Sequence, residues 1–397
     1  MEKLQNLFRL KHKTTYTTND SFEILYKAWA LNSMIPNKSK SFFNIFYIII
    51  CWFGMIMSPI QYMIGAIDGF RTVPIMVSLS HIQLAINCIP YVFKVFAIAA
   101  WAKRLKNTEP IFDRMDQRYQ RKEEKLKIEN CVLICRNFFI ISCMIFFSYQ
   151  FWVYTAAILQ HKYALNCKLP FVDWIPYPAI KYYLHFVSEL LYTIFLSTSQ
   201  ITNDLYSAIY IRAIRTHVNL LTGRILRLGD NPDCKEEENR EELLECIKSH
   251  KDLLEVADII GELISVTIFV QFATSAIILG ISMFNVLVFA NRIYQIICVL
   301  FYMCVLLQTL PTCYESSMLE ADCEKLSLAI FHCNWLALDK NTRKMIPYFI
   351  QRAQQGISFT AAKLFPINLR TNLSIAKFSF TLYTFITEMN IGEKIKE

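Results

Sequence analysis

Seven apolar stretches of helical length recur along the 397-residue chain, and they restrict its fold more than any other feature. A helix needs about 20 mostly apolar residues to cross roughly 30 Å of hydrocarbon, because its backbone polar groups must be satisfied within the segment. Two of the stretches are partly polar, since Tyr182–Ile201 carries His185 and Glu189, and Asn372–Asn390 is rich in Ser and Thr. The other five are strongly apolar: Phe42–Ile67, Val73–Ala100, Cys131–Leu159, Leu263–Ala290 and Ile293–Leu310. This pattern predicts an all-α membrane protein with seven transmembrane helices.

The composition agrees with a membrane protein and argues against several other classes. Hydrophobic residues make up 54% of the chain, its mean hydropathy is +0.30, and its charged residues, 19% of the total, lie in blocks between the apolar stretches. A formal charge of +8 could indicate a nucleic-acid partner. The basic residues, however, flank the apolar stretches, as they do in the cytoplasmic loops of membrane proteins. We therefore expect membrane lipid as a partner and no nucleic acid.

The orientation of the helices follows from the distribution of Lys and Arg among the loops. The N-terminal segment and the loops after the second, fourth and sixth stretches carry 7, 9, 8 and 7 of these residues, 31 in all. The remaining loops and the C-terminus carry only 7. The N-terminus is therefore expected in the cytoplasm and the C-terminus outside. Two glycosylation sequons, Asn19-Asp20-Ser21 and Asn37-Lys38-Ser39, disagree with this placement, but such three-residue patterns are common by chance.

Other membrane functions fit the sequence less well. G-protein-coupled receptors also have seven helices, but with the opposite orientation, and no Asp-Arg-Tyr type triplet follows the third stretch, which ends in Leu159-Gln160-His161-Lys162. The inverted repeats of many transporters are not evident. The thirteen cysteines show no metal-ligand spacing, and the chain contains no phosphate loop, His-Glu-x-x-His motif or nucleophile elbow. We therefore expect no enzyme activity and no cofactor.

The C-terminal third carries the most specific pattern. It consists of the runs Ile346-Pro347-Tyr348-Phe349-Ile350-Gln351-Arg352, Ala361-Ala362-Lys363-Leu364-Phe365-Pro366 and Ile375-Ala376-Lys377-Phe378-Ser379-Phe380-Thr381-Leu382-Tyr383. This resembles the end of insect odorant receptors, where a Gln-Arg pair and a Phe-containing turn precede a last helix rich in Ser and aromatic residues. Insect gustatory receptors share the architecture and are the alternative, but they usually end in Thr-Tyr, five apolar residues and Gln-Phe, which the last helix here does not contain.

The resemblance implies a subunit of an odorant-gated, non-selective cation channel in the plasma membrane of a sensory-neuron dendrite. It also implies a heterotetramer with coreceptor subunits around one central pore. The family's coreceptor has a much longer loop after the fourth helix, so this chain resembles a ligand-tuned subunit. Six segments are expected: a cytoplasmic N-terminal segment (1–41), helices one to four with the ligand-binding region (42–204), a cytoplasmic extension of the anchor (205–262), helices five and six (263–310), a cytoplasmic anchor segment (311–371), and the pore-lining last helix with a short extracellular tail (372–397).

In this family the odorant pocket lies in the outer half of the membrane, among helices two, three, four and six. Such a pocket is mostly apolar with a few polar anchors, and residues three or four apart share a helical face. Trp152 is favoured, since an aromatic plane suits terpenoid or benzenoid ligands. Each residue could equally serve helix packing or face lipid. The candidates form four pairs: Ser78 and His81, Tyr149 and Trp152, Phe186 and Leu190, and Tyr294 and Cys298.

The resemblance also suggests pore residues on the last helix. Counting forward from the Ala362-Lys363-Leu364-Phe365 turn places Phe385, Glu388 and Met389 at its pore-lining end, with Phe385 and Met389 at positions that resemble the family's hydrophobic gate. A carboxylate in an otherwise mostly neutral ring favours permeating cations. The alternative is that Glu388 marks the solvated end of the span.

Three charged residues inside the predicted spans need separate explanations. Glu189 and Arg136 are costly in hydrocarbon unless they meet water or a partner, and they are not expected to pair because they lie near opposite membrane faces. Lys94 lies in the cytoplasmic half of the second helix, where its long side chain is expected to extend outward to the membrane surface.

Overall fold

The computed structural model is almost entirely helical. It describes residues 16–35, 42–69, 75–161, 163–165, 167, 169, 172, 174–230, 235–285 and 292–388. Its elements are η1 (Thr18–Phe22), α2 (Glu23–Leu31), α3 (Phe42–Gly69), α4 (Ile75–Lys106), α5 (Glu109–Gln117), α6 (Lys122–Gln160), α8 (Pro178–Ile225), α9 (Glu236–Phe284), α10 (Arg292–Leu307), α11 (Leu310–His332), η3 (Trp335–Ala337), α12 (Lys340–Arg343), α13 (Met345–Ala353), β1 (Thr360–Ala361), β2 (Phe365–Pro366) and α14 (Leu369–Glu388).

Each of the seven predicted spans coincides with a helix, and these helices are α3, α4, α6, α8, α9, α10 and α14. Five segments of the described chain are long and apolar enough to cross a membrane by length and composition alone, and each overlaps one of the five strongly apolar stretches. The two partly polar stretches lie in α8 and α14, outside those five segments. The prediction of seven helices is confirmed for the described residues, and it depended on accepting polar side chains inside two spans.

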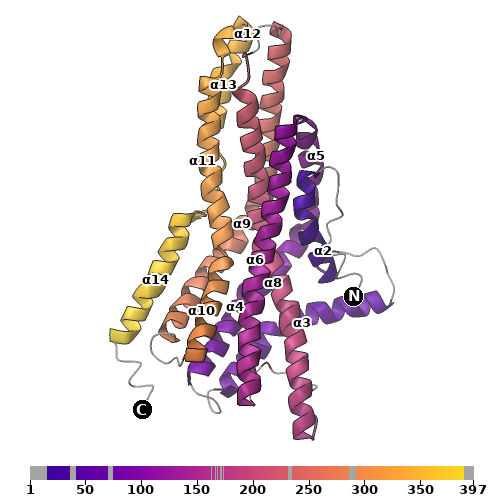
Figure 1. Ribbon diagram of the computed structural model, residues 1–397, viewed down its shortest axis with the longest axis vertical. Helices are drawn as coiled ribbons and strands as arrows, with labels where there is room; N and C mark the ends of the chain where they lie inside the picture. The colour runs from indigo at the N-terminus through magenta and orange to yellow at the C-terminus, as the bar shows by residue number, and fades with distance from the viewer. Residues whose placement is uncertain are drawn as a thin grey trace.

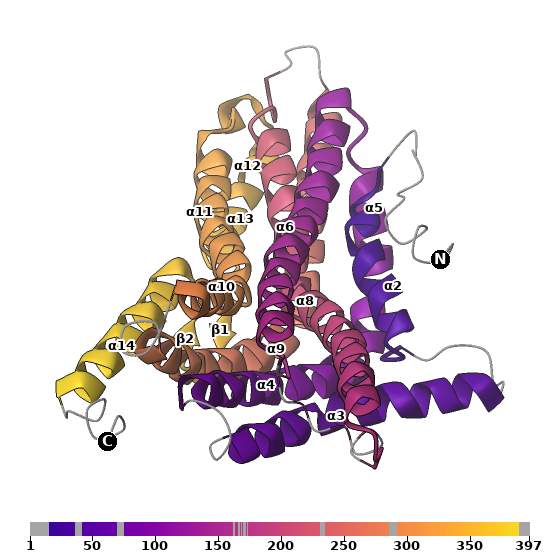
Figure 2. The ribbon, with the colours of Figure 1, turned by 60° about the horizontal axis from the view of Figure 1, so that its bottom comes forward.

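Three helices are much longer than a bilayer is thick. α6, α8 and α9 contain 39, 48 and 49 residues, so α8 alone is about 72 Å long at 1.5 Å per residue. The extensions of α8 and α9 pack together with α11 and α13 in the upper part of Figure 1, and α6 packs on α8. We call this part the distal bundle: residues 205–225 of α8, residues 236–262 of α9, α11 and α13. α3 and α4 lie side by side at the opposite end (Figure 2).

The segment around Gly229 separates α8 from α9. Gly229 has a φ of +80°, in the left-handed region that favours glycine. A Cβ at this position would lie 2.5 Å from the carbonyl oxygen of Asn334. The Asn334 side chain donates to the Gly229 carbonyl at 3.0 Å. Glycine is therefore required both by the backbone conformation and by the close approach of the segment after α11.

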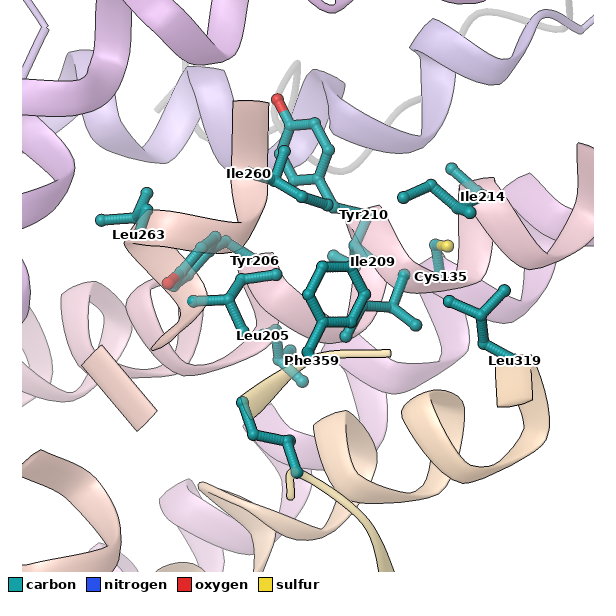
Figure 3. Packing of buried hydrophobic residues seen from close by; sticks show 14 of the residues in the cluster. Cys135, Leu205, Tyr206, Ile209, Tyr210, Ile214, Ile260, Leu263, Leu319 and Phe359 are labelled. Carbon is teal, nitrogen blue, oxygen red and sulfur yellow. The ribbon is translucent and has the colours of Figure 1, made fainter. Parts of the chain in front are cut away.

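The middle of α8 is the centre of the protein. Every residue from Ile201 to Ile211 is buried, and Figure 3 shows its apolar members packed against Ile260 of α9, Leu319 of α11 and Phe359. A helix segment buried on all sides must pair its polar side chains with neighbours. Four polar side chains of α8 each bond a different neighbouring helix. These bonds join Asn203 to Trp29 of α2, Asp204 to Lys94 of α4, Tyr206 to Thr267 of α9 and Ser207 to Thr312 of α11.

The described part of the N-terminal segment is docked on this centre. Phe22 of η1 stacks on Tyr210 with ring centroids 4.2 Å apart, and Trp29 of α2 is fully buried. Asn19 donates to the carbonyl of Glu109 at 3.0 Å and to Asp113 Oδ1 at 2.8 Å. A glycan on the Asn19 amide would break these contacts, which agrees with reading the first sequon as a chance match. The second sequon lies outside the described residues.

The expectation for Lys94 is wrong. Instead of extending to a membrane surface, its side chain turns inward, and only 1% of the residue is exposed. Lys94 Nζ donates to Asp204 Oδ1 at 2.5 Å and to Gln271 Oε1 at 2.7 Å. An ammonium group can stay buried when a carboxylate and further hydrogen bonds compensate its desolvation. Asp204 follows the end of the predicted span Tyr182–Ile201, 110 residues along the chain from Lys94.

Candidate functional site

The predicted pocket residues of α4 are Ser78 and His81, and they lie at the end of the protein opposite the distal bundle. Ser78 and His81 are both buried, at 0% and 4% exposure. The His81 ring is hydrogen-bonded to the backbone of Ala164, in the connection between α6 and α8. The structure thus places the start of α4 beneath this connection, so that both predicted side chains lie in the interior.

The remaining predicted pocket residues fall on different sides of α6. Tyr149 packs on Phe301 of α10 with ring centroids 5.4 Å apart, whereas Phe186 of α8 meets Tyr154 edge-on at 5.4 Å. Leu190 is half-buried on α8, and Cys298 of α10 is buried. Tyr294 lies on α10, but its side chain is outside the described part of the chain.

Trp152, the favoured candidate, lies off the buried face of α6. The buried face is formed by Phe146, Gln150, Val153 and Ala157, and Trp152 is 38% exposed and packs on its neighbour Phe151. Spacing of three or four residues shows that two side chains share a face, but it does not show which face points inward. Trp152 therefore stays a prediction, at a position on the surface of the isolated subunit.

A buried polar cluster between α3, α6 and α8 was not recognised as a site from the sequence. Its centre is Thr193 Oγ1, which lies 2.9 Å from the hydroxyl of Tyr154 and 3.3 Å from that of Tyr62. Gln150 Nε2 donates to Ser197 Oγ at 2.5 Å on the same side of α8. The signal was present as the spacing of His185, Glu189, Thr193 and Ser197, which repeats every four residues and places four polar side chains on one face of a membrane helix.

Glu189 anchors the connection between α6 and α8. It is fully buried and accepts hydrogen bonds from the backbone N–H groups of Cys167 at 2.7 Å and Leu165 at 3.3 Å. His185 Nε2 lies 2.8 Å from the Cys167 carbonyl oxygen. Backbone N–H groups thus take the place of a cation, and Arg136, which is exposed, is not its partner. This arrangement ties Leu165 and Cys167 of the connection to the first turns of α8.

The outward face of α14 carries both large apolar side chains and polar side chains. Its exposed residues include large apolar side chains, and Phe385 is 57% exposed. A polar stripe with helical spacing runs along the same helix and consists of Arg370, Ser374, Lys377, Thr381 and Glu388, all exposed. Met389 lies outside the described residues. α14 packs mainly on α9 and stands at the edge of the bundle in Figures 1 and 2. Phe385 and Glu388 therefore lie on the exposed surface of the chain, and their pore role stays a prediction.

Comparisons with known proteins agree on one family. Residues 75–380 match the family described as 7tm Odorant receptor. The chain is 31% identical to odorant receptor 43b of Drosophila melanogaster over 348 residues, with 86% of each chain covered. It is 27% identical to odorant receptor 85a of the same fly over 396 residues, which cover 99% of this chain and 97% of the relative.

Solved structures show the same fold. The insect olfactory receptor OR5 from Machilis hrabei matches with a TM-score of 0.73 at 17% identity, over 90% of this chain and 96% of the receptor. The same receptor in complex with eugenol gives a TM-score of 0.73 at 15% identity, over 93% of this chain and 100% of the receptor. The seven-helix fold predicted from the sequence is therefore the fold of insect olfactory receptors.

Proposed function

The chain belongs to the insect odorant receptor family, whose members are ion channels rather than enzymes, and on this premise we propose that it is an odorant-gated cation channel subunit that opens a central pore together with coreceptor subunits. The observation that supports assembly with other subunits is the outward face of α14. A polar stripe beside large exposed apolar side chains is unfavourable against lipid and is explained when neighbouring subunits cover the apolar part and the stripe lines water.

The ligand is a small volatile odorant that binds at the far end of the bundle, beneath the connection held by Glu189. The eugenol complex of the olfactory receptor OR5, which has the same fold, supports a small odorant as the kind of ligand. Such a pocket needs aromatic surfaces and a few hydrogen-bonding groups, and Tyr62 and Tyr154 supply both beside Thr193. The distal bundle then forms the cytoplasmic anchor of a heterotetramer in the plasma membrane.

Recording from cells that express the chain with and without an insect coreceptor tests this function. The probe is a panel of short-chain esters, alcohols, aldehydes, terpenoids and eugenol. We expect rapid inward cation current only when both subunits are present and only with some panel members, and the coreceptor alone serves as the control. No odorant-evoked current at a demonstrated surface density, or a current that the chain alone supports fully, contradicts the proposal.

The proposed orientation has its own test. A tag at Met1 should be accessible only after permeabilisation, and a tag after Glu397 should be accessible on intact cells, because the basic loops carry 31 Lys and Arg residues against 7 in the other set. Labelling of the N-terminal tag on intact cells would reverse the orientation.

Tyr149 and Trp152 differ in burial, and this predicts a difference between their alanine variants. Tyr149→Ala should raise the concentration for half-maximal current more than Trp152→Ala, because Tyr149 packs on Phe301 inside the bundle whereas Trp152 is 38% exposed. Loss of a buried aromatic contact removes about 1–3 kcal/mol. Concentration–response curves at matched surface density measure the effect, and a larger shift for Trp152→Ala would instead place the ligand on the opposite face of α6.

Glu388 is the proposed acidic group of the pore. At about 5 Å from a monovalent ion, an effective dielectric constant between 20 and 80 gives roughly 1–3 kcal/mol before salt screening. Glu388→Gln should therefore lower calcium permeability relative to sodium, modestly because coreceptor subunits share the ring, and it should leave the order of odorant potencies unchanged. Reversal potentials in calcium and sodium solutions measure this, and unchanged values in a normally expressed variant would remove Glu388 from the pore.

A further inference from the structure

A chain of buried polar side chains crosses the bundle from α4 to the break between α10 and α11. Lys94 Nζ bonds Asp204 of α8 and donates to Gln271 Oε1 of α9 at 2.7 Å. Gln271 Nε2 donates in turn to Gln308 Oε1 at 2.6 Å. At most 5% of each of these four residues is exposed. We call Lys94, Asp204, Gln271 and Gln308 the buried relay.

The Lys94 ammonium group determines which atom donates and which accepts in each hydrogen bond of the relay. An ammonium group has three donors and no acceptor, so Gln271 must turn its carbonyl oxygen toward Lys94. The Gln271 amide nitrogen then faces Gln308, which accepts the hydrogen bond through its side-chain carbonyl oxygen. A change in the position of Lys94 therefore alters the bond that Gln271 offers to Gln308, two helices away.

The relay ends at a helix break that also holds the last helix. α10 ends at Leu307 and α11 begins at Leu310, so Gln308 and Thr309 form the break. Thr309 Oγ1 accepts a hydrogen bond at 2.7 Å from Asn372 of α14, which is 7% exposed. Two consecutive residues of one break thus bond α9 on one side and α14 on the other. Element ends of this kind absorb the φ/ψ changes of conformational transitions.

We propose that the buried relay and the Gln308–Thr309 break couple the ligand-binding helices to the pore helix α14. The inference rests on the proposed function, because it assigns residues that position the gate of that channel. Displacement of α4 or α8 on ligand binding changes the Lys94–Gln271 bond, and the break passes the change to Asn372. The contiguous bonds from α4 through α9 to α14 carry the coupling, and the proposal requires the break to change its arrangement when the channel opens.

Two neutral variants test the relay. Gln271→Met and Gln308→Met each remove the bond between α9 and the break with little change in side-chain length, and they leave Lys94 paired with Asp204. Ser275→Ala is the matched control, because Ser275 Oγ accepts the other hydrogen bond of the same Gln271 amide, at 3.0 Å, on a branch that does not lead to the break. Each variant is expressed with the coreceptor, and current is recorded with the most potent member of the odorant panel and normalised to surface density.

We expect each Gln variant to lower the maximal current per surface channel at least about 5-fold, the lower end of typical allosteric coupling. The double variant should fall no further than the more severe single variant, because both remove the same bond. The rank order of odorant potencies should persist, and Ser275→Ala should resemble wild type. Currents that track surface density alone, losses that multiply in the double variant, or an equal loss in Ser275→Ala would overturn the relay. Absence of odorant-evoked current from the wild-type pair would overturn the channel function itself.

Discussion

Lys94→Met is expected to remove most of the protein from the cell surface. The substitution leaves the Asp204 carboxylate, 5% exposed, without its cation in the centre of the bundle. Breaking a buried ion pair by removing one partner costs about 3–5 kcal/mol, a large share of the roughly 5–15 kcal/mol that keeps a typical domain folded. Surface biotinylation relative to total protein, together with thermal stability of the detergent-solubilised protein, measures the loss.

Two further variants separate the charge effect from lost packing. Lys94→Met combined with Asp204→Leu should recover much of the surface expression, because no unpaired charge then remains buried. Arg104→Met is the matched control, since Arg104 and Glu262 also pair α4 with α9 at 2.7 Å, but their side chains are 55% and 63% exposed. An exposed pair is worth about 0–1 kcal/mol. Equal losses for Lys94→Met and Arg104→Met would contradict the burial argument.

Arg215→Met is expected to have the second large effect, in the distal bundle. Arg215 Nε donates to Asp322 at 2.7 Å, and Arg215 Nη1 donates to Glu315 at 3.1 Å. These two bonds join α8 to α11. The side chains of both carboxylates are nearly inaccessible, at 4% and 1% exposure. Losing this cation should cost about 3 kcal/mol, the lower end for a broken buried ion pair, because Arg212 of α8 still lies 3.7 Å from Glu315 and Asn219 still donates to Asp322 at 2.9 Å. The weakened contact between α8 and α11 should also disrupt assembly. Native gel migration of the complex with the coreceptor and thermal stability measure the two consequences.

Arg240→Met supplies the comparison for Arg215→Met. Arg240 pairs with Glu237 at 3.8 Å within α9, and both side chains are more than half exposed. Its removal should change thermal stability by less than about 1 kcal/mol. If Arg215→Met behaved like Arg240→Met, the ion pairs between α8 and α11 would not stabilise the distal bundle.

The seven helices were predictable because the bilayer requires a length and a composition that a sequence displays directly. Even the polar spans in α8 and α14 could be identified by length. The inward turn of Lys94 could not, since its partner Asp204 lies 110 residues away and only the packing of α4 against α8 brings them together. The resemblance implied an extension over residues 205–262, but the continuation of α8 as one helix to Ile225 could not be read from hydropathy, because its central residues are buried by other helices.

The pocket was less predictable than the fold for a related reason. Pair spacing on α6 was compatible with either face pointing inward, and the structure turns Tyr149 toward α10 while Trp152 lies at the surface. The polar cluster around Thr193 has a readable spacing on α8, but its partners come from α3 and α6. Helical phase follows from contacts between segments, and a single sequence shows phase only where polar residues repeat on one face.

Recording from outside-out patches of cells that express the chain with the coreceptor tests direct gating by odorant. The patch is held without GTP or ATP on its inner face, and the most potent panel odorant is applied to its outer face. Channel openings that begin promptly, persist without nucleotides and carry both sodium and potassium are the predicted result. Openings that require GTP, or odorant responses that vanish on excision while coreceptor openings persist, would contradict a channel that the odorant opens directly.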